Sequence, residues 1–216
     1  MLKKIFSRRE EENLAREAGR LPPGQSLTKK FPVLHYGPVP NADLSSWDFR
    51  VFGLVETERT WDWKAFNALP RTRIQLDIHC VTRWSKLDTE WEGVSVAVLV
   101  REELIRPLPG ARFVVQHCEA GYTTNTPLDT VLQDNFLLAT HYAGESLTPQ
   151  HGYPLRAVVG SFNDRSEEST AYLWKGGKWL RGLEFRADDQ PGFWEKSGYH
   201  NDADPWKEER FARRSW

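Results

Sequence analysis

The chain has 216 residues, enough for one large domain or two small ones with a substantial buried core. Its formal net charge is -1 although 27% of its residues are charged, so no overall field attracts it to nucleic acid or to a membrane. No apolar run is long enough to span a bilayer. Two cysteines, Cys80 and Cys118, do not form a disulfide framework, which is typical of a reducing compartment. We therefore expect a cytoplasmic protein without nucleic-acid or membrane partners.

The first 30 residues differ in composition from the rest of the chain. Residues 1–19 predict a short, highly charged helix that ends at a glycine and is followed by two prolines. The stretch has a basic start but no apolar region, so a secretory signal is not expected. We interpret residues 1–30 as a charged tail or peripheral helix, with partner docking left open, and residues 31–216 as the folded domain.

The next segments predict an extended arm, a strand and a helix. Residues 31–40 (FPVLHYGPVP) contain too many prolines for a central strand and are expected to form a pocket wall or a surface arm. Residues 47–55 alternate in hydropathy and predict a strand. Residues 61–69 predict a short helix that ends before Pro70.

An apolar alternation over residues 74–78 predicts a strand with one buried face that delivers Cys80 to its end. His79, Thr82, Arg83 and Ser85 follow or precede the cysteine closely. A guanidinium beside the thiol is expected to lower its pKa, because the thiolate gains an opposite charge nearby. Such a thiolate is a nucleophile, a redox group or a ligand for a soft metal. The alternative is a buried, inert cysteine at the end of a strand.

The second half of the chain predicts short strands with irregular connections. The expected elements are a strand or short helix at 94–103, a strand at 111–117, a polar turn at 123–127, a helical turn at 128–132, and strands at 135–142 and 157–159. Because strands and helices do not alternate regularly, the pattern favours an α+β fold with a mixed sheet. No glycine fingerprint opens a helix after a strand, which disfavours a doubly wound nucleotide-binding fold.

Three further segments follow the last predicted strand. Residues 160–170 are polar and acidic and predict an inserted loop. In residues 172–182, lysines and an arginine stand among glycines and aromatics, which fits either a phosphate-binding backbone or a glycine hairpin with solvated lysines. Residues 191–216 contain few aliphatic side chains and are expected to wrap over the domain.

Several of these segments, in this order, resemble the molybdopterin-binding domain of the sulfite oxidase family, and within it the small bacterial oxidoreductases. The resemblance runs from about residue 31 to residue 211, and the ordered set of motifs is specific although each is weak by itself. The motifs are HYGPVP at 35–40, HCVTRWS at 79–85, GYTTN at 121–125, HGYPLR at 151–156, GKW at 177–179, GFWEKSGYH at 192–200 and DPWKEER at 204–210. The resemblance implies a mixed-sheet domain that binds molybdopterin.

The resemblance also implies a ligand set for a molybdenum–molybdopterin cofactor. Cys80 matches the cysteine whose thiolate binds molybdenum, and soft sulfur suits a redox-active transition metal. His151, Arg156 and Lys178 match residues that hold the pterin and its phosphate, where charged hydrogen bonds are about twice as strong as neutral ones. Cys118 falls in a region of the family without a metal role and is expected to be a core cysteine.

Other residues are assigned by the segment in which they fall. His35 and Tyr36 lie in the segment that lines the pterin cleft of the relatives, so we predict that they contact the cofactor. Arg83, which is close to the expected metal ligand, is a candidate for tuning the metal or contacting the substrate. Tyr199 and His200, in the closing segment over the metal, are candidates for the same catalytic roles.

One departure from the family changes the expected reaction. Leu34 stands where animal and plant sulfite oxidases carry an arginine that helps to bind sulfite. A haem domain and the dimerisation domain of those enzymes are absent from the sequence, so a separate electron-transfer protein is expected. The resemblance implies oxygen-atom transfer on a small-molecule substrate, with S- or N-oxide reduction favoured. Sulfite dehydrogenase activity, a non-catalytic cofactor-binding or interaction domain, and a thiol enzyme that uses Cys80 as nucleophile remain the alternatives.

Overall fold

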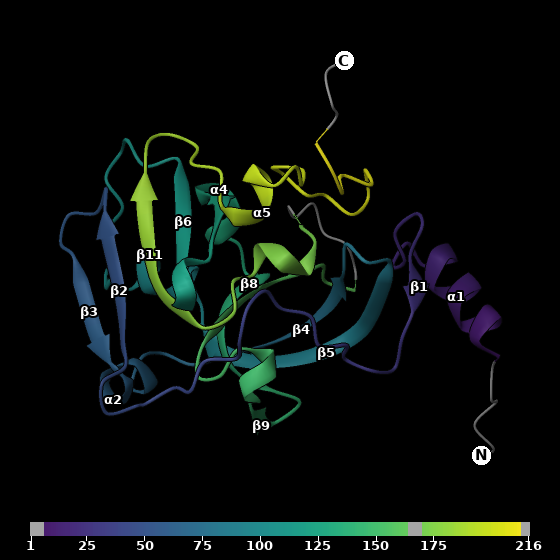
Figure 1. Cartoon of the computed structure of the whole chain (residues 1–216), viewed down its shortest axis with the longest axis horizontal. Coiled ribbons are helices and arrows are strands. Elements are labelled where there is room, and N and C mark those ends of the chain that lie inside the picture. The colour runs from purple at the N-terminus through teal and green to yellow at the C-terminus, as the bar shows by residue number, and fades with distance from the viewer. Residues whose placement is uncertain (1–6, 164–169, 213–216) are drawn as a thin grey trace.

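Two β-sheets form the centre of the protein (Figure 1), whose computed structural model describes residues 7–163 and 170–212. Each sheet is mixed, because it combines antiparallel pairs with one parallel pair. The six-stranded sheet contains β1 (Ser26–Leu27), β4 (Thr72–His79), β5 (Trp84–Val94), β8 (Phe136–Tyr142), β9 (Glu145–Ser146) and β10 (Arg156–Val159). The five-stranded sheet has the order β3 (Arg59–Asp62), β2 (Asp48–Gly53), β11 (Leu180–Arg186), β6 (Phe113–Cys118) and β7 (Thr123–Pro127). The expected α+β class with mixed sheets is confirmed.

Short helices connect the strands within the described ranges. They are α1 (Arg8–Glu17), α2 (Trp63–Asn67), α3 (Val96–Arg101), α4 (Leu128–Val131) and α5 (Phe193–Lys196), together with the 3₁₀ turns η1 (Glu119–Gly121), η2 (Pro149–His151) and η3 (Leu173–Lys175). None of the helices in this part of the chain is long and apolar enough to cross a membrane.

The apolar side chains on the two faces of β8 explain how the sheets pack. On β8, Phe136 and Leu138 belong to the core cluster that also contains Phe49 and Leu183 from the five-stranded sheet. The intervening Leu137 belongs to a second cluster on the other face of the six-stranded sheet. Because successive side chains of a strand point to opposite faces, β8 is buried on both faces and its sequence is a continuous apolar run.

Most predicted elements are confirmed, and one is wrong. The strands expected at 47–55, 111–117, 135–142 and 157–159 correspond to β2, β6, β8 and β10, and the alternative at 94–103 is resolved as α3. Residues 123–127 form β7 instead of the expected polar turn, and they pair with β6 along its length. Their buried polar side chains are satisfied within the fold, because Gln116 Nε2 donates to Thr126 Oγ1 over 3.0 Å.

The N-terminal region contains the expected helix and also a strand. The Ser7 hydroxyl caps α1 together with Glu10, as the capping box requires, and residues 1–6 lie outside the described residues. Beyond the helix, β1 pairs in parallel with the start of β5. Arg20 forms an ion pair with the buried carboxylate of Asp77 over 2.7 Å. The stretch after α1 is therefore part of the sheet layer, although the sequence separated residues 1–30 from the domain.

The C-terminal region wraps over the domain, as its composition predicted. In Figure 1 it runs in yellow along the top of the molecule from α5 toward the C-terminus, above β4 and β5. The Tyr172 amide donates to the carbonyl of the buried Ala203 over 2.8 Å, which attaches this segment to the domain. Residues 213–216 are outside the described part. The acidic loop expected at 160–170 also falls largely outside it, because residues 164–169 are not described.

Candidate active site

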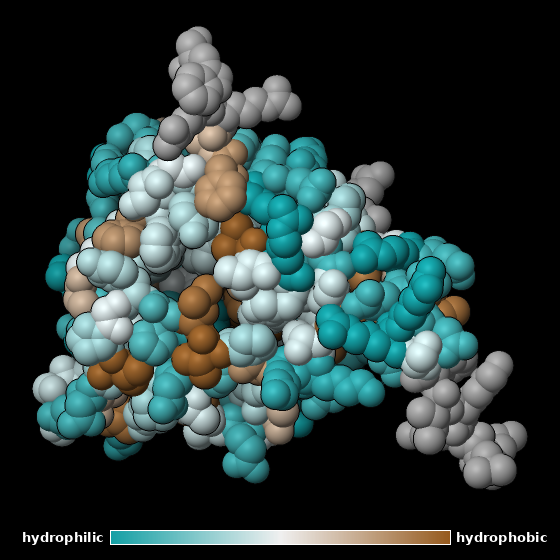
Figure 2. Space-filling view, turned by 45° about the vertical axis from the view of Figure 1, so that its right-hand side comes forward, coloured by the Kyte–Doolittle hydropathy of each residue, from teal (hydrophilic) through white to brown (hydrophobic). Residues whose placement is uncertain are grey.

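A cavity of about 340 Å³ lies where the loop after β4 meets segments from distant parts of the chain. Figure 2 shows apolar side chains gathered around a recess on this side of the molecule. Six residues predicted from the sequence line the cavity: His35, Tyr36, Cys80, Arg156, Lys178 and Tyr199. The fold therefore brings together most of the predicted site from five separate segments.

Cys80 follows β4 directly and begins a tight turn. The Arg83 amide donates to the Cys80 carbonyl over 3.0 Å, and the Cys80 amide donates to the Trp84 carbonyl over 2.8 Å. The sulfur is 3.1 Å from Thr82 Oγ1. Burial raises the pKa of the Cys80 thiol, and hydrogen bonds from Thr82 with the charges of Arg210 and Lys178 oppose this only in part. A metal cation at the sulfur would favour the thiolate, as metal coordination does for thiols generally.

The expected effect of Arg83 on the thiol is wrong. Arg83 has a left-handed backbone conformation, with φ at 72°, and does not line the cavity. Its Nη1 atom lies 2.9 Å from the position that a Cβ on Gly24 would occupy, so the guanidinium lies toward the N-terminal segment. The cations that act on the sulfur come from Arg210 and Lys178, which are distant in sequence.

Arg156 is a buried cation on the cavity wall. Its guanidinium donates to the carbonyls of Ala157 over 3.1 Å, His151 over 3.2 Å and Gly176 over 3.4 Å. Burial lowers the pKa of Arg156 to about 10. Within the described ranges its side chain has no carboxylate partner, so a positive charge lies in the wall without a matching negative charge.

Lys178 supplies a second cation to the same wall. Its Nζ atom donates to the carbonyls of Leu34 over 2.8 Å and Gln150 over 2.7 Å. Burial and then the charge of Arg156 lower the pKa of Lys178 to about 7. No carboxylate among the described residues pairs with this ammonium group. The lowered pKa of Lys178 reflects burial beside another cation without a carboxylate to offset it.

His151 lies behind the cavity wall. Its ring stacks on Phe31, which lines the cavity, with the ring centroids 4.0 Å apart and an interplanar angle of 14°. Burial, followed by the charges of Arg156 and Lys178, lowers the pKa of His151 to about 4, so the imidazole is neutral at pH 7. Its buried Nδ1 atom has no hydrogen-bond partner in the part of the chain that is described.

His35 and Tyr36 form the outer rim of the cavity. His35 Nδ1 donates to the Gly37 carbonyl over 3.0 Å, which orients the imidazole, and its ring lies near Trp179. Tyr36 is 59% exposed, and its ring packs against Phe193 with centroids 4.4 Å apart. The predicted pterin-cleft segment therefore reaches the closing C-terminal segment.

Of the two candidates in the closing segment, Tyr199 and His200, one lines the cavity and the other does not. Tyr199 lines the cavity and packs between Trp174 and Trp194, with ring centroids 5.6 and 5.0 Å away. His200 does not line it, and its Nδ1 atom accepts hydrogen bonds from the amides of Asp202 and Ala203 over 3.2 and 3.4 Å. His200 has the role of a turn residue in this geometry.

Lys175 was one of the cations among glycines that suggested a phosphate site. It is buried and forms an ion pair with Glu195 over 2.7 Å, and it also donates to Asn125. Because its charge is already matched, Lys175 is part of the structural core beneath the closing segment. Within residues 172–182, the predicted phosphate site therefore depends on Lys178.

Sequence reasoning missed two residues that hold the Cys80 loop. Gln25 Nε2 donates to the Cys80 carbonyl over 3.1 Å, and Arg210 Nη1 donates to the Val81 carbonyl over 2.6 Å. Gln25 stands in no motif, and Arg210 ends the DPWKEER motif, whose sequence does not indicate a contact with the cysteine loop. Their contacts arise from tertiary packing of the two terminal segments, which a single sequence does not reveal.

The residues present fit a molybdopterin cofactor. Two cations without carboxylate partners face the cavity, and buried unpaired charges are costly, so an anionic phosphate group would supply the missing charge. The cavity also presents one thiol, the type of ligand that a soft redox metal prefers. The orphaned Nδ1 of the neutral His151 offers a further hydrogen bond close to the same wall.

Comparisons with known proteins agree with this fit. Residues 36–194 match the family described as oxidoreductase molybdopterin binding domain. The chain is 43% identical to the uncharacterized oxidoreductase YuiH of Bacillus subtilis, covering 91% of this chain and 94% of YuiH. It is 24% identical to the protein-methionine-sulfoxide reductase catalytic subunit MsrP of Gluconobacter oxydans (74% of this chain, 61% of MsrP). It is also 26% identical to Arabidopsis thaliana sulfite oxidase (76% of this chain, 48% of that enzyme).

A solved structure supports the fold. The sulfane dehydrogenase SoxCD from Paracoccus pantotrophus superposes with a TM-score of 0.61 at 19% identity, covering 85% of this chain and 48% of that chain. The chain thus spans nearly all of YuiH but only about half to three fifths of the other relatives. The chain belongs to the oxidoreductase molybdopterin binding domain family and is a molybdopterin-binding oxidoreductase of the sulfite oxidase type.

Proposed function

We propose that the protein transfers an oxygen atom to or from a small substrate at a molybdenum–molybdopterin centre bound by Cys80, with reduction of an S- or N-oxide favoured. One observation carries the proposal. The buried Cys80 thiol shares a cavity with Arg156 and Lys178, and neither cation has a carboxylate partner in the described part of the chain. The bound cofactor would supply the two-electron redox chemistry, which protein side chains by themselves do not provide.

Different side chains of the cavity would bind different parts of the cofactor. Cys80 would bind the metal through its thiolate. Arg156 and Lys178 would bind the phosphate through charge-assisted hydrogen bonds. Phosphate binding would return the pKa of Lys178 toward its usual range, because an anion beside the ammonium favours the protonated form.

The remaining predicted residues would position the organic part of the cofactor. His151 is neutral, and its Nδ1 atom can exchange a hydrogen bond with a polar group of the pterin. His35 and Tyr36 stand at the rim, where a ring system entering the cavity would contact their side chains. Tyr199 lines the same cavity as Cys80 and is the candidate for contact with the substrate.

The charges on the wall favour a neutral substrate. Among the described residues that line the cavity, the charged ones are Glu119, Arg156 and Lys178. Glu119 is already paired with Arg181 over 2.8 Å, and we assign both cations to the phosphate. Leu34 adds no charge, and its carbonyl accepts from Lys178. An anion such as sulfite would therefore lack a cation, whereas a neutral S- or N-oxide needs none.

The reaction balances with an external electron donor. An S-oxide takes up two electrons and two protons and yields the sulfide and water. We assign the electrons to a separate electron-transfer protein in the cytoplasm. Similarity to a methionine-sulfoxide reductase supports this direction, and similarity to a sulfite oxidase supports the opposite one.

The cofactor assignment is tested by elemental analysis of protein from a molybdenum-replete host, with released pterin detected by fluorescence. We expect about one molybdenum per chain in the native protein and little in Cys80→Ser, because thiolate affinity for a soft metal is lost. Metal-free native protein, or full occupancy in Cys80→Ser, would contradict the assignment.

The direction is tested with the metal-loaded protein. We expect a reduced viologen dye to be consumed with dimethyl sulfoxide, methionine sulfoxide or trimethylamine N-oxide. Sulfite with an artificial electron acceptor serves as the opposite assay. Faster turnover of sulfite than of every oxide would reverse the proposed direction. Full occupancy with no turnover in either assay would favour the non-catalytic alternative.

A further inference from the structure

Two terminal segments, remote from the Cys80 loop in sequence, meet over it. Gln25 Nε2 donates to the Cys80 carbonyl over 3.1 Å, and the Ser26 amide donates to the Arg83 carbonyl over 3.1 Å. From the other end of the chain, Arg210 Nη1 donates to the Val81 carbonyl over 2.6 Å. Both segments lie outside residues 36–194, the part that matches the family.

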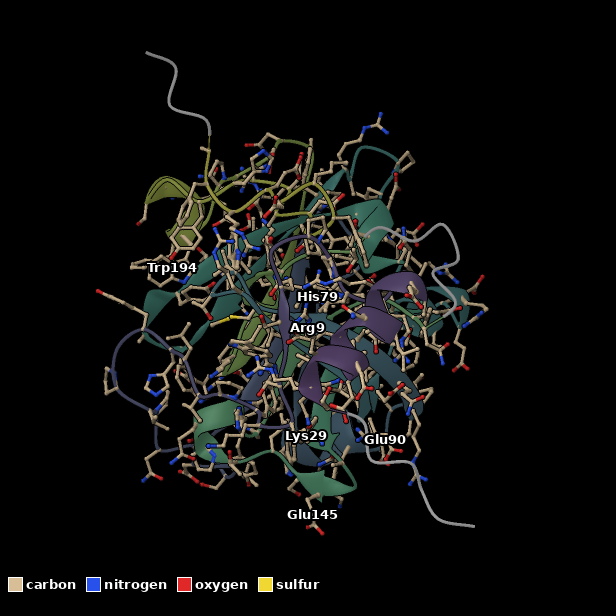
Figure 3. The ribbon with its side chains drawn as sticks, turned by 90° about the vertical axis from the view of Figure 1, so that its right-hand side faces the viewer. Arg9, Lys29, His79, Glu90, Glu145 and Trp194 are labelled. Atoms are coloured by element: carbon tan, nitrogen blue, oxygen red, sulfur yellow. The ribbon has the colours of Figure 1, made fainter. Side chains whose placement is uncertain are left out.

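The two segments interlock at one glycine. Gly24 has a φ of +66°, and a Cβ placed there would be 2.6 Å from Glu208 Oε1 and 2.9 Å from Arg83 Nη1. The same position is 3.6 Å from Arg210 Nη2. The N-terminal backbone therefore approaches the C-terminal side chains closely, directly beside the cysteine loop. Figure 3 faces this side of the molecule, with α1 and Lys29 toward the viewer.

Arg210 is a buried cation without a carboxylate at hydrogen-bond distance among the described residues. Its side chain is 7% exposed, and Glu208, the nearest carboxylate recorded for it, is 3.9 Å away, beyond hydrogen-bond distance. Its Nε and Nη2 atoms have no hydrogen-bond partner in the described part of the protein. The guanidinium lies over the Tyr172 ring, 4.9 Å from its centroid. Because Arg210 does not line the cavity, it does not compete with Arg156 or Lys178 for the phosphate.

We propose that Arg210, with Gln25, is a positioning residue for the metal ligand: it fixes the peptide after Cys80 and places a positive charge beside the Cys80 loop. This inference rests on the proposed role of Cys80. Hydrogen bonds at two consecutive carbonyls limit rotation of the Cys80 backbone, which in turn directs the sulfur. Groups that orient a metal ligand contribute about 10–100-fold to metal affinity, and net charge near sulfur ligands tunes reduction potentials.

Three variants separate orientation from charge. Arg210→Gln removes the charge, Arg210→Lys keeps the charge without the planar fork, and Gln25→Met removes the hydrogen bond to Cys80 at similar volume. Arg73→Gln is the matched control, because Arg73 is 85% exposed and pairs with Glu92 in a surface ion pair. Each variant is purified as the full chain from a molybdenum-replete host.

The first measurement is hydrogen exchange of the peptide covering residues 80–84, in protein with and without metal. We expect about tenfold faster exchange in Arg210→Gln and Gln25→Met, and unchanged exchange in a peptide from β6. This readout does not require that Cys80 bind a metal. Native exchange at residues 80–84 in both variants would overturn the positioning role, whether or not the proposed cofactor is present.

The second measurement is the rate of molybdenum loss and the metal reduction potential in the loaded protein. We expect about tenfold faster metal loss in Arg210→Gln and Gln25→Met. The potential should be lowered in Arg210→Gln, because a neighbouring cation no longer favours the reduced metal, and restored in Arg210→Lys. An unchanged potential in Arg210→Gln would overturn the charge role. If Arg210→Gln fails to fold, Arg210→Met, which also removes the charge and can pack on the Tyr172 ring, gives the potential, and Gln25→Met gives the exchange and metal-loss tests.

Discussion

The ends of β4 and β6 carry the two cysteines of the chain, and they differ in what faces the sulfur. Cys80 is 6% exposed and Cys118 is 8% exposed, and burial raises the thiol pKa of both. Cys118 Sγ is only 2.5 Å from the position of a Cβ on Gly177, so the neighbouring backbone seals it into the core. Cys80 faces the cavity with Lys178 nearby. Burial therefore does not distinguish the proposed metal ligand from the core cysteine, whereas the open volume beside Cys80 does.

The largest expected difference comes from replacing each cysteine with serine. Cys80→Ser should lose nearly all molybdenum, while Cys118→Ser should keep about one per chain. The Cys118 variant should instead lose about 1–3 kcal/mol of stability, because a hydroxyl is buried without a designed partner. Elemental analysis and urea unfolding measure the two effects. Equal metal loss in both variants would remove the distinction between the two sites.

The two cations that line the cavity, Arg156 and Lys178, provide the next test. Arg156→Ala and Lys178→Ala should each weaken cofactor retention by about 1.5–3 kcal/mol, since each removes a charged hydrogen bond to the phosphate. Pterin released per chain, measured by fluorescence after dialysis, reports the loss. Arg73→Ala removes an exposed cation and should retain the cofactor fully. Full retention in both cavity variants would mean that the phosphate binds elsewhere.

The close packing around Cys118 is tested by substituting Gly177. Gly177→Ala should destabilise the protein by about 1–3 kcal/mol, because the added methyl group overlaps the Cys118 sulfur and forces the core to shift. Combining it with Cys118→Ala should recover part of this loss, since the double variant removes the overlapping atom. Urea unfolding of the single and double variants gives the coupling energy. Strict additivity of the two substitutions would show that the sulfur is not the obstacle.

The smallest expected effect is a pH dependence of the cofactor-free protein, prepared from a host that cannot make the cofactor. Lys178 has a folded pKa of about 7, below the usual 10.5, so the unfolded chain binds more protons between these values. The stability of the native protein should therefore rise with pH across this window. Lys178→Met should be more stable than native by about 1 kcal/mol below pH 7, and the difference should shrink toward pH 10. Parallel profiles of melting temperature against pH would contradict the lowered pKa.

The fold was predictable where strands are apolar and difficult where polar strands pair. β8 and β10 follow from apolar runs that are buried on both faces. β7 was missed because Thr123–Pro127 resembles a turn in composition, and its strand state depends on pairing with β6 and on partners such as Gln116. The first half of β5 was missed for the same reason, since the exposed and charged residues there are held by pairing with β4.

The candidate site was also predictable only in part from the sequence. Motif resemblance identified Cys80, Arg156, Lys178 and Tyr199, which the structure assembles in one cavity. Sequence proximity misled for Arg83, because adjacency along the chain does not determine the direction of a side chain in a left-handed turn.

The sequence by itself determined the chemical types available to this protein: a thiol at a strand end, cations among glycines, and an aromatic closing segment in family order. Only the tertiary structure decided which cations are matched by carboxylates, as Lys175 is by Glu195, and which face the cavity without one, as Lys178 does. It also brought Gln25 and Arg210 to the cysteine loop. The physical reason is that charge pairing and burial depend on distances between remote segments, whereas residue type and local pattern are properties of the chain alone.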